Sequence, residues 1–275
     1  MQRDGIAAIA VCATLAAPLL ARAETPQERG AYLVKSIAAC GNCHTDSAPG
    51  AAELAGGMRF SELAYTARAA NLTPDPENGV AGWTDDQLVR GLRDGKRPKG
   101  STIGPPMPVT TYRSMSDDDA RAIVAYLRSI PPRPNHVPHS TYRLPLPESW
   151  GPEVTTVAAP PDNDPVAYGR YLASGLGQCM DCHSRRGENG LPDFVNGLAA
   201  GGAELRGPWG VSLAPNITPN GIGYYSDDEL RKVITTGVRP DGSKLNPPMP
   251  VAYYANMTAK DLSAIIAFLR SLPKK

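Results

Sequence analysis

Aromatic side chains are scarce in this sequence, and charges of the two signs nearly cancel. The 275 residues include three Trp, three Phe and eleven Tyr, against 27 Gly and 28 Pro. A loop-rich chain with so few aromatics needs another apolar body on which short helices can pack. The 28 basic and 27 acidic residues form neither a basic footprint for nucleic acid nor an acidic tail. A nucleic-acid-binding protein is therefore not indicated.

Long apolar runs are also absent, except at the N-terminus. Arg3 precedes an apolar stretch over residues 5–20, and Ala21-Arg22-Ala23 fits a small-x-small cleavage site. Residues 1–23 are therefore predicted to be a secretory signal peptide. The alternative is a retained membrane anchor, although the stretch is shorter than the roughly 20 residues that a span needs. No transmembrane span is predicted once the signal is cleaved.

Cysteine is rare, and its distribution is informative. Of five cysteines, Cys12 falls in the predicted signal, and the other four lie in two runs of one pattern: Cys40-Gly41-Asn42-Cys43-His44 and Cys179-Met180-Asp181-Cys182-His183. The C-x-x-C-H pattern is typical of covalent c-type haem attachment. The two thiols form thioethers with the haem vinyl groups, and the histidine ligates the iron.

Three other interpretations of a C-x-x-C pair remain open at this point. It can be a redox dithiol, half of a zinc site or a structural disulfide. A dithiol does not need a following histidine, and a zinc site would not need one after both pairs. The repeated pattern therefore favours two covalently attached haem c groups, which would also supply the missing core. Haem is attached to exported bacterial proteins in the periplasm, so the sequence predicts a periplasmic protein, or one peripheral to the inner membrane.

The halves of the chain repeat one another beyond these two runs. Each half has Asn-x-Thr-Pro, read as a turn, and a Pro-Pro-Met-Pro loop followed by Tyr112 or Tyr254. Helix starts recur at capping residues, namely Thr25, Thr84, Ser116, Asp164, Ser226 and Thr258. Residues 133–163 are proline-rich and are predicted to be a linker that straps the halves together. The expected domains are 24–132 and 164–275.

The second axial position of each iron decides between electron transfer and ligand binding. Met107 and Met249 lie in proline-hemmed loops, 63 and 66 residues after His44 and His183. A stiff loop can hold a thioether at a fixed place, and Met/His ligation is the pattern of cytochromes c. We therefore expect Met107 and Met249 to be iron ligands. Another repeated pair, Met115 and Met257, precedes two helix caps and is better explained as a hydrophobic staple.

These motifs together resemble class I cytochrome c domains, and more closely the multihaem cytochrome c subunits of periplasmic alcohol and gluconate dehydrogenases and of some molybdenum hydroxylases. The resemblance covers nearly the whole mature chain. It implies a mainly α fold with two tandem class I cytochrome c domains, each a few short helices wrapped round a covalent haem. It also implies that the first and last helices of each half cross, with Gly30 facing the Tyr126 region and Gly169 facing Phe268. Many such subunits carry a third haem, for which this sequence has no motif.

The predicted function is that of a non-enzymatic dihaem electron carrier. A periplasmic dehydrogenase would be the donor, and a downstream cytochrome or terminal oxidase the acceptor. The alternative is a dihaem catalytic cytochrome, such as a peroxidase or a thiosulfate-oxidising protein, with one open or ligand-switching iron. His136 or His139 could serve in such a switch. A gas sensor is disfavoured because no signalling domain follows.

Overall fold

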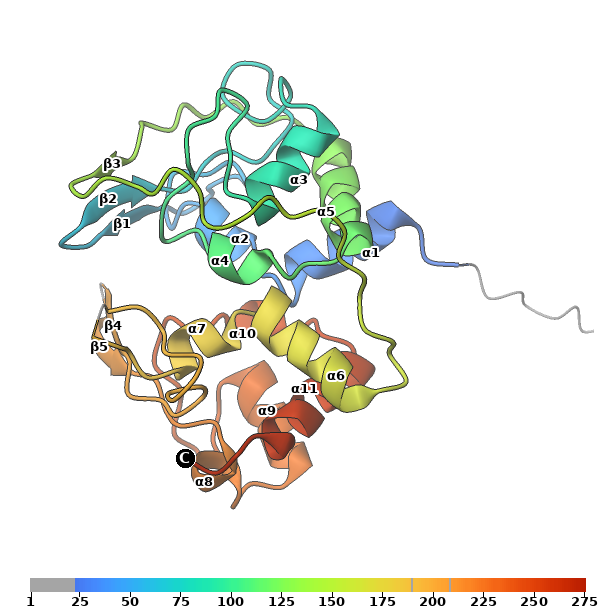
Figure 1. The fold of residues 1–275 in the computed structure, drawn as a ribbon, viewed down its shortest axis with the longest axis vertical. Helices are drawn as coiled ribbons and strands as arrows, with labels where there is room; N and C mark the ends of the chain where they lie inside the picture. The colour runs from blue at the N-terminus through green and yellow to red at the C-terminus, as the bar shows by residue number, and fades with distance from the viewer. Residues whose placement is uncertain (1–22, 189, 208) are drawn as a thin grey trace, which may run out of the picture.

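The computed structural model describes residues 23–275 apart from 189 and 208, so nearly all of the predicted signal peptide lies outside the described residues. Two helical halves lie one above the other and are joined by a long segment that we call the strap, residues 133–163 (Figure 1). The mainly helical architecture predicted from the sequence is confirmed. No helix in the described residues is long and apolar enough to cross a membrane.

Each half contains a long final helix and several short ones. The first half has α1 (Pro26–Lys35), α2 (Gly41–His44), α3 (Asp85–Arg93), α4 (Val109–Tyr112) and α5 (Asp117–Ser129). The second half has α6 (Pro165–Arg170), the π-helix η1 (Tyr171–Leu176), α7 (Cys179–His183), α8 (Pro219–Ile222), α9 (Asp227–Thr236), α10 (Val251–Tyr254) and α11 (Ala259–Ser271).

The predicted helix starts are confirmed because their signals are local. Full capping boxes, in which the cap side chain and the third helical residue satisfy each other's backbone N–H, open three helices. They are Thr25 with Glu28, Thr84 with Gln87 and Ser226 with Glu229. Single side-chain caps begin three more, at Ser116, Asp164 and Thr258. The predicted Asn-x-Thr turns also form, with Thr73 and Thr218 each donating to the preceding asparagine.

The first and last helices of each half cross at a glycine. A Cβ on Gly30 of α1 would lie 1.8 Å from the Ala122 carbonyl oxygen of α5 and 2.8 Å from Tyr126 Cβ. A Cβ on Gly169 of α6 would lie 1.8 Å from the Ala264 oxygen of α11. The expected crossing beside Tyr126 is confirmed. In the second half, the nearest atoms belong to Ala264 and Ile265, about one turn before Phe268.

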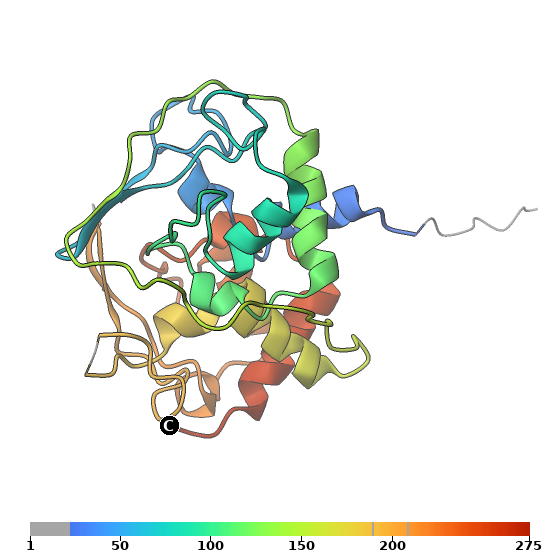
Figure 2. The ribbon, with the colours of Figure 1, turned by 45° about the horizontal axis from the view of Figure 1, so that its top comes forward.

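Two β-hairpins, which the sequence did not suggest, project from the same side of the molecule (Figures 1 and 2). In the first half, β1 (Arg59–Ser61) pairs with β2 (Tyr65–Arg68), and β3 (Thr141–Tyr142) of the strap adds a third antiparallel strand beside β2. In the second half, β4 (Glu204–Gly207) pairs with β5 (Gly210–Leu213), and within the described residues this sheet has two strands. The strap is therefore part of the first half's sheet as well as a linker.

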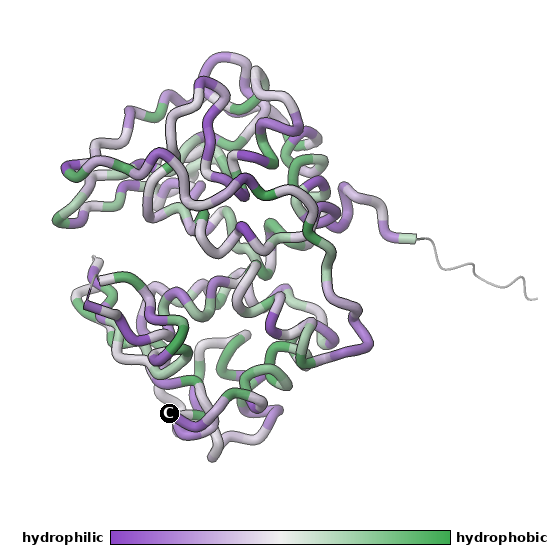
Figure 3. The backbone as a smooth tube through the Cα atoms, viewed as in Figure 1, coloured by the Kyte–Doolittle hydropathy of each residue, from purple (hydrophilic) through white to green (hydrophobic). Residues whose placement is uncertain are grey.

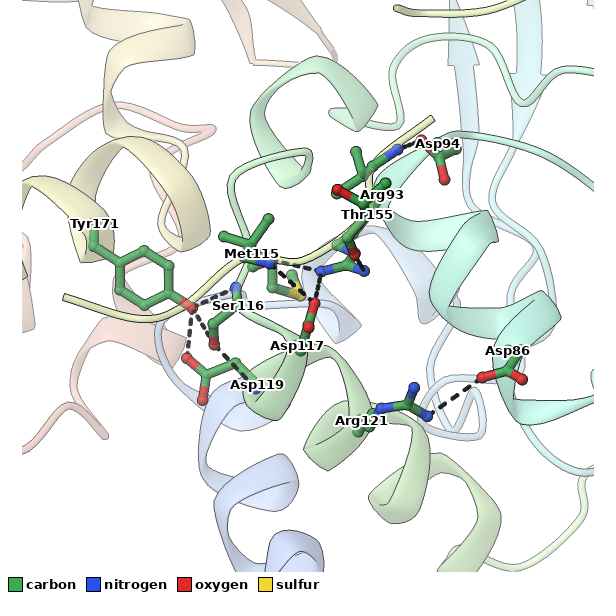
Figure 4. A network of polar contacts seen from close by, with 12 residues as sticks. Asp86, Arg93, Asp94, Met115, Ser116, Asp117, Asp119, Arg121, Thr155 and Tyr171 are labelled. Atoms are coloured by element: carbon green, nitrogen blue, oxygen red, sulfur yellow. Dashed lines mark hydrogen bonds and ion pairs between the residues drawn. The ribbon is translucent and has the colours of Figure 1, made fainter. Parts of the chain in front are cut away.

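The strap is also pinned to the first half further along. The Arg93 guanidinium bonds the Asp117 carboxylate and the carbonyls of Met115 and Thr155 (Figure 4). The Asp117 N–H donates to the Val157 carbonyl at 2.9 Å, and the Val157 N–H donates to the Asp117 carboxylate at 3.3 Å. After these contacts the strap becomes hydrophilic where it leads into α6 (Figure 3).

The two halves dock through a pair of related polar contacts. Tyr171 of η1 donates to Asp119 at 2.7 Å and accepts from the Ser116 N–H, at the start of α5 (Figure 4). Tyr32 of α1 likewise donates to Asp261 at 2.6 Å and accepts from the Thr258 N–H, at the start of α11. Each half thus contributes one tyrosine that hydrogen-bonds to the start of the last helix of the other half. A single hydrophobic core includes buried residues of both halves.

Candidate functional site

The two C-x-x-C-H runs form short helices of their own. Helix α2 follows Ala39, whose φ is 46°, and α7 follows Gln178, whose φ is 55°. A left-handed residue at each of these points turns the chain between the preceding helical segment and the motif. The motif then makes one helical turn, which presents its two cysteines and its histidine from one short element. The sequence thus gives the same local geometry twice.

The four cysteines are free thiols in half-buried positions, and no disulfide joins them. Burial raises the pKa of Cys40 and of Cys179 to about 12. Burial, with a smaller contribution from Cys182, raises the pKa of Cys43 to about 11. Redox dithiols have a lowered pKa on the attacking thiol, which is the reverse of this arrangement. The burial of these thiols therefore does not favour the redox-dithiol interpretation.

Each motif histidine has one ring nitrogen fixed by a backbone carbonyl. His44 Nδ1 lies 2.7 Å from the Ala70 oxygen, and His183 Nδ1 lies 2.8 Å from the Pro215 oxygen. Burial lowers the pKa of both imidazoles, so the neutral form is favoured. A carbonyl bonded to Nδ1–H fixes the tautomer in which Nε2 carries the free lone pair, as in metal-ligating histidines.

The described residues do not contain a group of three or more His, Cys, Asp or Glu side chains arranged to hold a metal ion. Zinc in structural sites is held by four converging ligands of these types, whereas each motif offers two thiols and one imidazole. Two thiols with one oriented imidazole do suit a haem, because its porphyrin supplies the other ligands of the iron. The residues present therefore fit a covalently attached haem at each motif.

The predicted methionine ligands lie in matching loops before α4 and α10. Met107 and Met249 are half-buried, and each carbonyl accepts at 2.9 Å from the N–H two residues later. The following short helix returns toward the motif: Tyr112 donates to the Ala38 carbonyl at 3.4 Å, and Tyr254 to the Gly177 carbonyl at 2.7 Å. Each methionine loop is thereby tied to the segment that precedes its own C-x-x-C-H helix.

The other repeated methionines belong to the apolar core. Met115 is fully buried in the core, and Met257 is partly buried and packs against the core. His136 and His139 are exposed on the strap. Strap residues, among them His139 and Tyr142, line part of a cavity of about 830 Å³ whose walls also include Trp83 and Arg97. Neither the motif cysteines nor His44 line it.

The two motifs approach one another across the interface between the halves, which sequence reasoning did not predict. Thr111 of α4 donates to the Asp181 carboxylate, inside the second motif, at 2.7 Å. A Cβ on Gly41, inside the first motif, would lie 2.4 Å from the Tyr253 hydroxyl of the second half. These pairs are separated by 70 residues or more, so periodicity and spacing along the sequence carry no signal for them.

Comparison with known proteins is consistent with this geometry. Residues 25–127 match the family described as cytochrome c oxidase, cbb3-type, subunit III. The fold and this match define a cytochrome c protein, whose domain type carries covalently attached haem c.

Three relatives make the assignment more specific. The chain is 32% identical to the cytochrome c subunit of a quinone alcohol dehydrogenase from Gluconobacter oxydans, over 90% of this chain and 54% of that protein. It is 32% identical to the fructose dehydrogenase cytochrome subunit of Gluconobacter japonicus, over 94% and 55%. It is 31% identical to a diheme cytochrome c-type protein of Cereibacter sphaeroides, over 85% and 82%.

The chain belongs to the family of c-type cytochromes that includes these dehydrogenase cytochrome subunits and the diheme cytochrome. It spans about half the length of the first two relatives.

Proposed function

We propose that this protein is a periplasmic dihaem cytochrome c that passes single electrons from a dehydrogenase to a downstream cytochrome or terminal oxidase. Residues 24–132 and 164–275 would be its two cytochrome c domains, with 133–163 as linker and 1–23 as cleaved signal. Cys40 and Cys43 would attach one haem, and Cys179 and Cys182 the other. The axial ligands would be His44 with Met107 and His183 with Met249. The protein would act as an electron carrier and not as an enzyme.

The repeated thiol and imidazole geometry is the observation that supports two haems. In both halves a half-buried histidine is held through Nδ1 by a backbone carbonyl, at 2.7 and 2.8 Å, and two free thiols lie on the same helical turn. A haem bound at each motif supplies reversible one-electron exchange at its iron. The chain's own contribution is to hold two imidazoles and four cysteine sulfurs in fixed positions.

The approach of the motifs favours transfer between the halves. Thr111 bonds Asp181 at 2.7 Å, and Tyr253 covers Gly41, so short contacts link one attachment helix to the other half. The related proteins named as alcohol and fructose dehydrogenase cytochrome subunits support a dehydrogenase as donor.

Optical spectra of the purified holoprotein test the ligand assignment. A haem-to-protein ratio of two is expected, together with the weak long-wavelength ferric band of Met-to-iron coordination. Met107→Ala and Met249→Ala should each remove about half of that band, because each opens one iron. Met115→Leu and Met257→Leu serve as matched controls, since those methionines pack in the core, and should leave the band unchanged.

Carbon monoxide distinguishes the carrier from the catalytic alternative. The ferrous parent should not bind it, because both irons are closed by methionine, whereas each Met→Ala variant should. A high-spin ferric haem or ready carbon monoxide binding in the parent would contradict the carrier proposal. Peroxide and sulfur substrates would then be assayed.

A further inference from the structure

The strap covers a defined surface of the first half. Strand β3 pairs with β2 in the register Tyr65 to Tyr142 and Thr66 to Thr141. Tyr142 then reaches over the proline loop: its hydroxyl donates to the Pro105 carbonyl at 3.0 Å, and a Cβ on Gly104 would lie 2.6 Å from its ring. An extended segment thus lies on both a sheet edge and the loop that carries Met107.

The second half has the same surface without a cover. The two hairpins correspond, because the same backbone hydrogen bond closes the base of each. The Gly57 N–H donates to the Ala69 carbonyl at 2.9 Å, and the Gly202 N–H donates to the Ala214 carbonyl at 2.8 Å. Thr66 and Arg68 are half-buried under the strap. Their counterparts on β5, Val211 and Leu213, are 52% and 66% exposed.

The loop beside the sheet differs in the same way. Gly104 is buried, whereas its counterpart Asn246 is exposed. Within the described residues, no third strand lies next to β5. The two parts that the strap contacts in the first half, the sheet edge and the proline loop, are therefore both exposed in the second half.

The open edge of β5 also presents main-chain hydrogen-bonding groups. Ala214 bonds back toward β4, donating to the Ala203 carbonyl at 2.9 Å. Successive residues of a strand point their N–H and C=O groups in alternate directions. The groups of Val211 and Leu213 therefore point away from β4. Such an edge is a template for another strand.

We propose that the edge of β5, with the adjoining Asn246 loop, is a docking site for an extended segment of a partner protein, which adds antiparallel to β5 as the strap adds to β2. The segment would carry apolar side chains toward Val211 and Leu213. It would have a small side chain where the strap has Tyr142, because the second half has Asn246 at the position where Gly104 leaves room for the Tyr142 ring.

A second copy of this chain fits this surface less well. Its own β5 is held at both ends, by the pairing of Gly207 with Gly210 and by the bonds of Ala214. A β5 strand fixed in this way has too few free residues to cover both the sheet edge and the proline loop of another copy. A segment with free, proline-rich flanks, like the strap, can do both. The proposal does not rest on the proposed electron route.

A labelled peptide provides the probe. It carries strap residues 134–147 with Tyr142→Ala, and with Thr141→Val and His139→Leu, so that apolar side chains face Val211 and Leu213 in the register of β3 on β2. Its anisotropy is followed as holoprotein is added. Saturable binding to the parent is expected. Val211→Pro, which removes one outward N–H, should weaken binding about tenfold, whereas Val211→Thr keeps that N–H and should change binding less than about threefold. The haem spectrum of each variant is recorded first, so that loss of haem is distinguished from loss of docking.

Size selectivity gives an independent check. The same peptide with Tyr142 retained should bind the parent about tenfold more weakly than the alanine form. Asn246→Gly should reduce this difference to less than about threefold, because it restores the space of Gly104.

Hydrogen exchange on the parent tests the site without relying on a variant. Added alanine peptide should protect the Val211 and Leu213 amides. Absence of saturable binding, or binding without this protection, would overturn the proposal. So would a concentration-dependent dimer of the parent that Val211→Pro abolishes, because a second copy would then occupy the edge.

Discussion

Gly30 and Gly169 are the residues that most directly limit helix packing. A Cβ at either position would lie 1.8 Å from a carbonyl oxygen of the last helix, and backbone on both sides leaves little room for relaxation. We expect Gly30→Ala and Gly169→Ala each to lower the free energy of unfolding by about 3 kcal/mol or more. Denaturant unfolding of the holoprotein, followed by far-UV circular dichroism, measures this.

Gly82→Ala is the matched control, because a Cβ there meets no atom within 4 Å. It should change the free energy of unfolding by less than about 0.5 kcal/mol. Equal losses for all three variants would mean that the close approach of the helices does not explain the glycines.

The sequence predicts the cysteines and histidines of the site, but not the backbone groups that orient the histidines. The cysteines and histidines were identified because a five-residue motif fixes their relative positions. The carbonyls that orient the imidazoles belong to Ala70 and Pro215, 26 and 32 residues away. Any residue can supply a carbonyl, so its side chain carries no signal for this role.

The anchoring of the strap rests on the pair Arg93 and Asp117. The Arg93 side chain is 7% exposed and Asp117 is its charged partner. Asp117→Asn keeps the shape but leaves the guanidinium with carbonyl acceptors alone. We expect a loss of about 2 kcal/mol in the free energy of unfolding, with faster amide exchange at Val157.

The same pair predicts an acid dependence. The hydrogen bond from Arg93 lowers the pKa of Asp117 from its ordinary 3.8. A lowered folded-state pKa means that the stabilisation is fully present above pH 3.8 and is lost as the pH falls through the folded value. Asp117→Asn should therefore flatten the decline in stability below about pH 4.

Asp86→Asn is the control for the strap anchor. Asp86 pairs with Arg121 on the surface, with side chains 79% and 63% exposed. Its removal should cost less than about 0.5 kcal/mol and leave the acid profile unchanged. A similar effect of both substitutions would indicate a general charge effect instead of strap anchoring.

Helices were predicted better than strands for a physical reason. A capping box such as Thr84 with Gln87 involves neighbours three residues apart, so the sequence contains the whole interaction. Strand β2 pairs with Tyr142, 77 residues further along in the register, and both strands are too short for alternation to be visible. The strap was therefore interpreted as a linker alone, without its third strand.

In the whole molecule, the two interface tyrosines should not be equally important. Asp119 also receives two bonds from Arg29, at 2.8 and 3.2 Å, so it keeps a charged partner without Tyr171. Asp261 has no arginine in this role, because Tyr168 occupies the position that corresponds to Arg29. We expect Tyr32→Phe to cost about 2 kcal/mol and Tyr171→Phe about 1 kcal/mol in the free energy of unfolding. Tyr224→Phe, at a residue 74% exposed, is the control.

The same interface should weaken in alkali. Burial raises the pKa of Tyr32 and Tyr171 above the ordinary 10, and that of Tyr168 to about 12. A raised folded-state pKa means that the stabilisation is fully present below pH 10 and is lost as the pH rises through the folded values. Denaturant midpoints should fall above pH 10, and less steeply in the Tyr32→Phe and Tyr171→Phe double variant. An unchanged slope in that variant would assign the effect to other groups.

One hydrophobic core joins the two halves, with Leu33 and Ile123 from the first and Leu172 and Ile266 from the second. Buried contacts shared in this way couple the halves, so the holoprotein should unfold in a single transition with coincident curves for circular dichroism and haem absorbance. The Tyr32→Phe and Tyr171→Phe double variant removes hydrogen bonds that hold the two halves against each other, but it changes no residue of either C-x-x-C-H motif. It should therefore separate the curve into two transitions while the ferric spectrum stays unchanged. Two transitions in the parent would mean that the halves behave as independent domains on a tether.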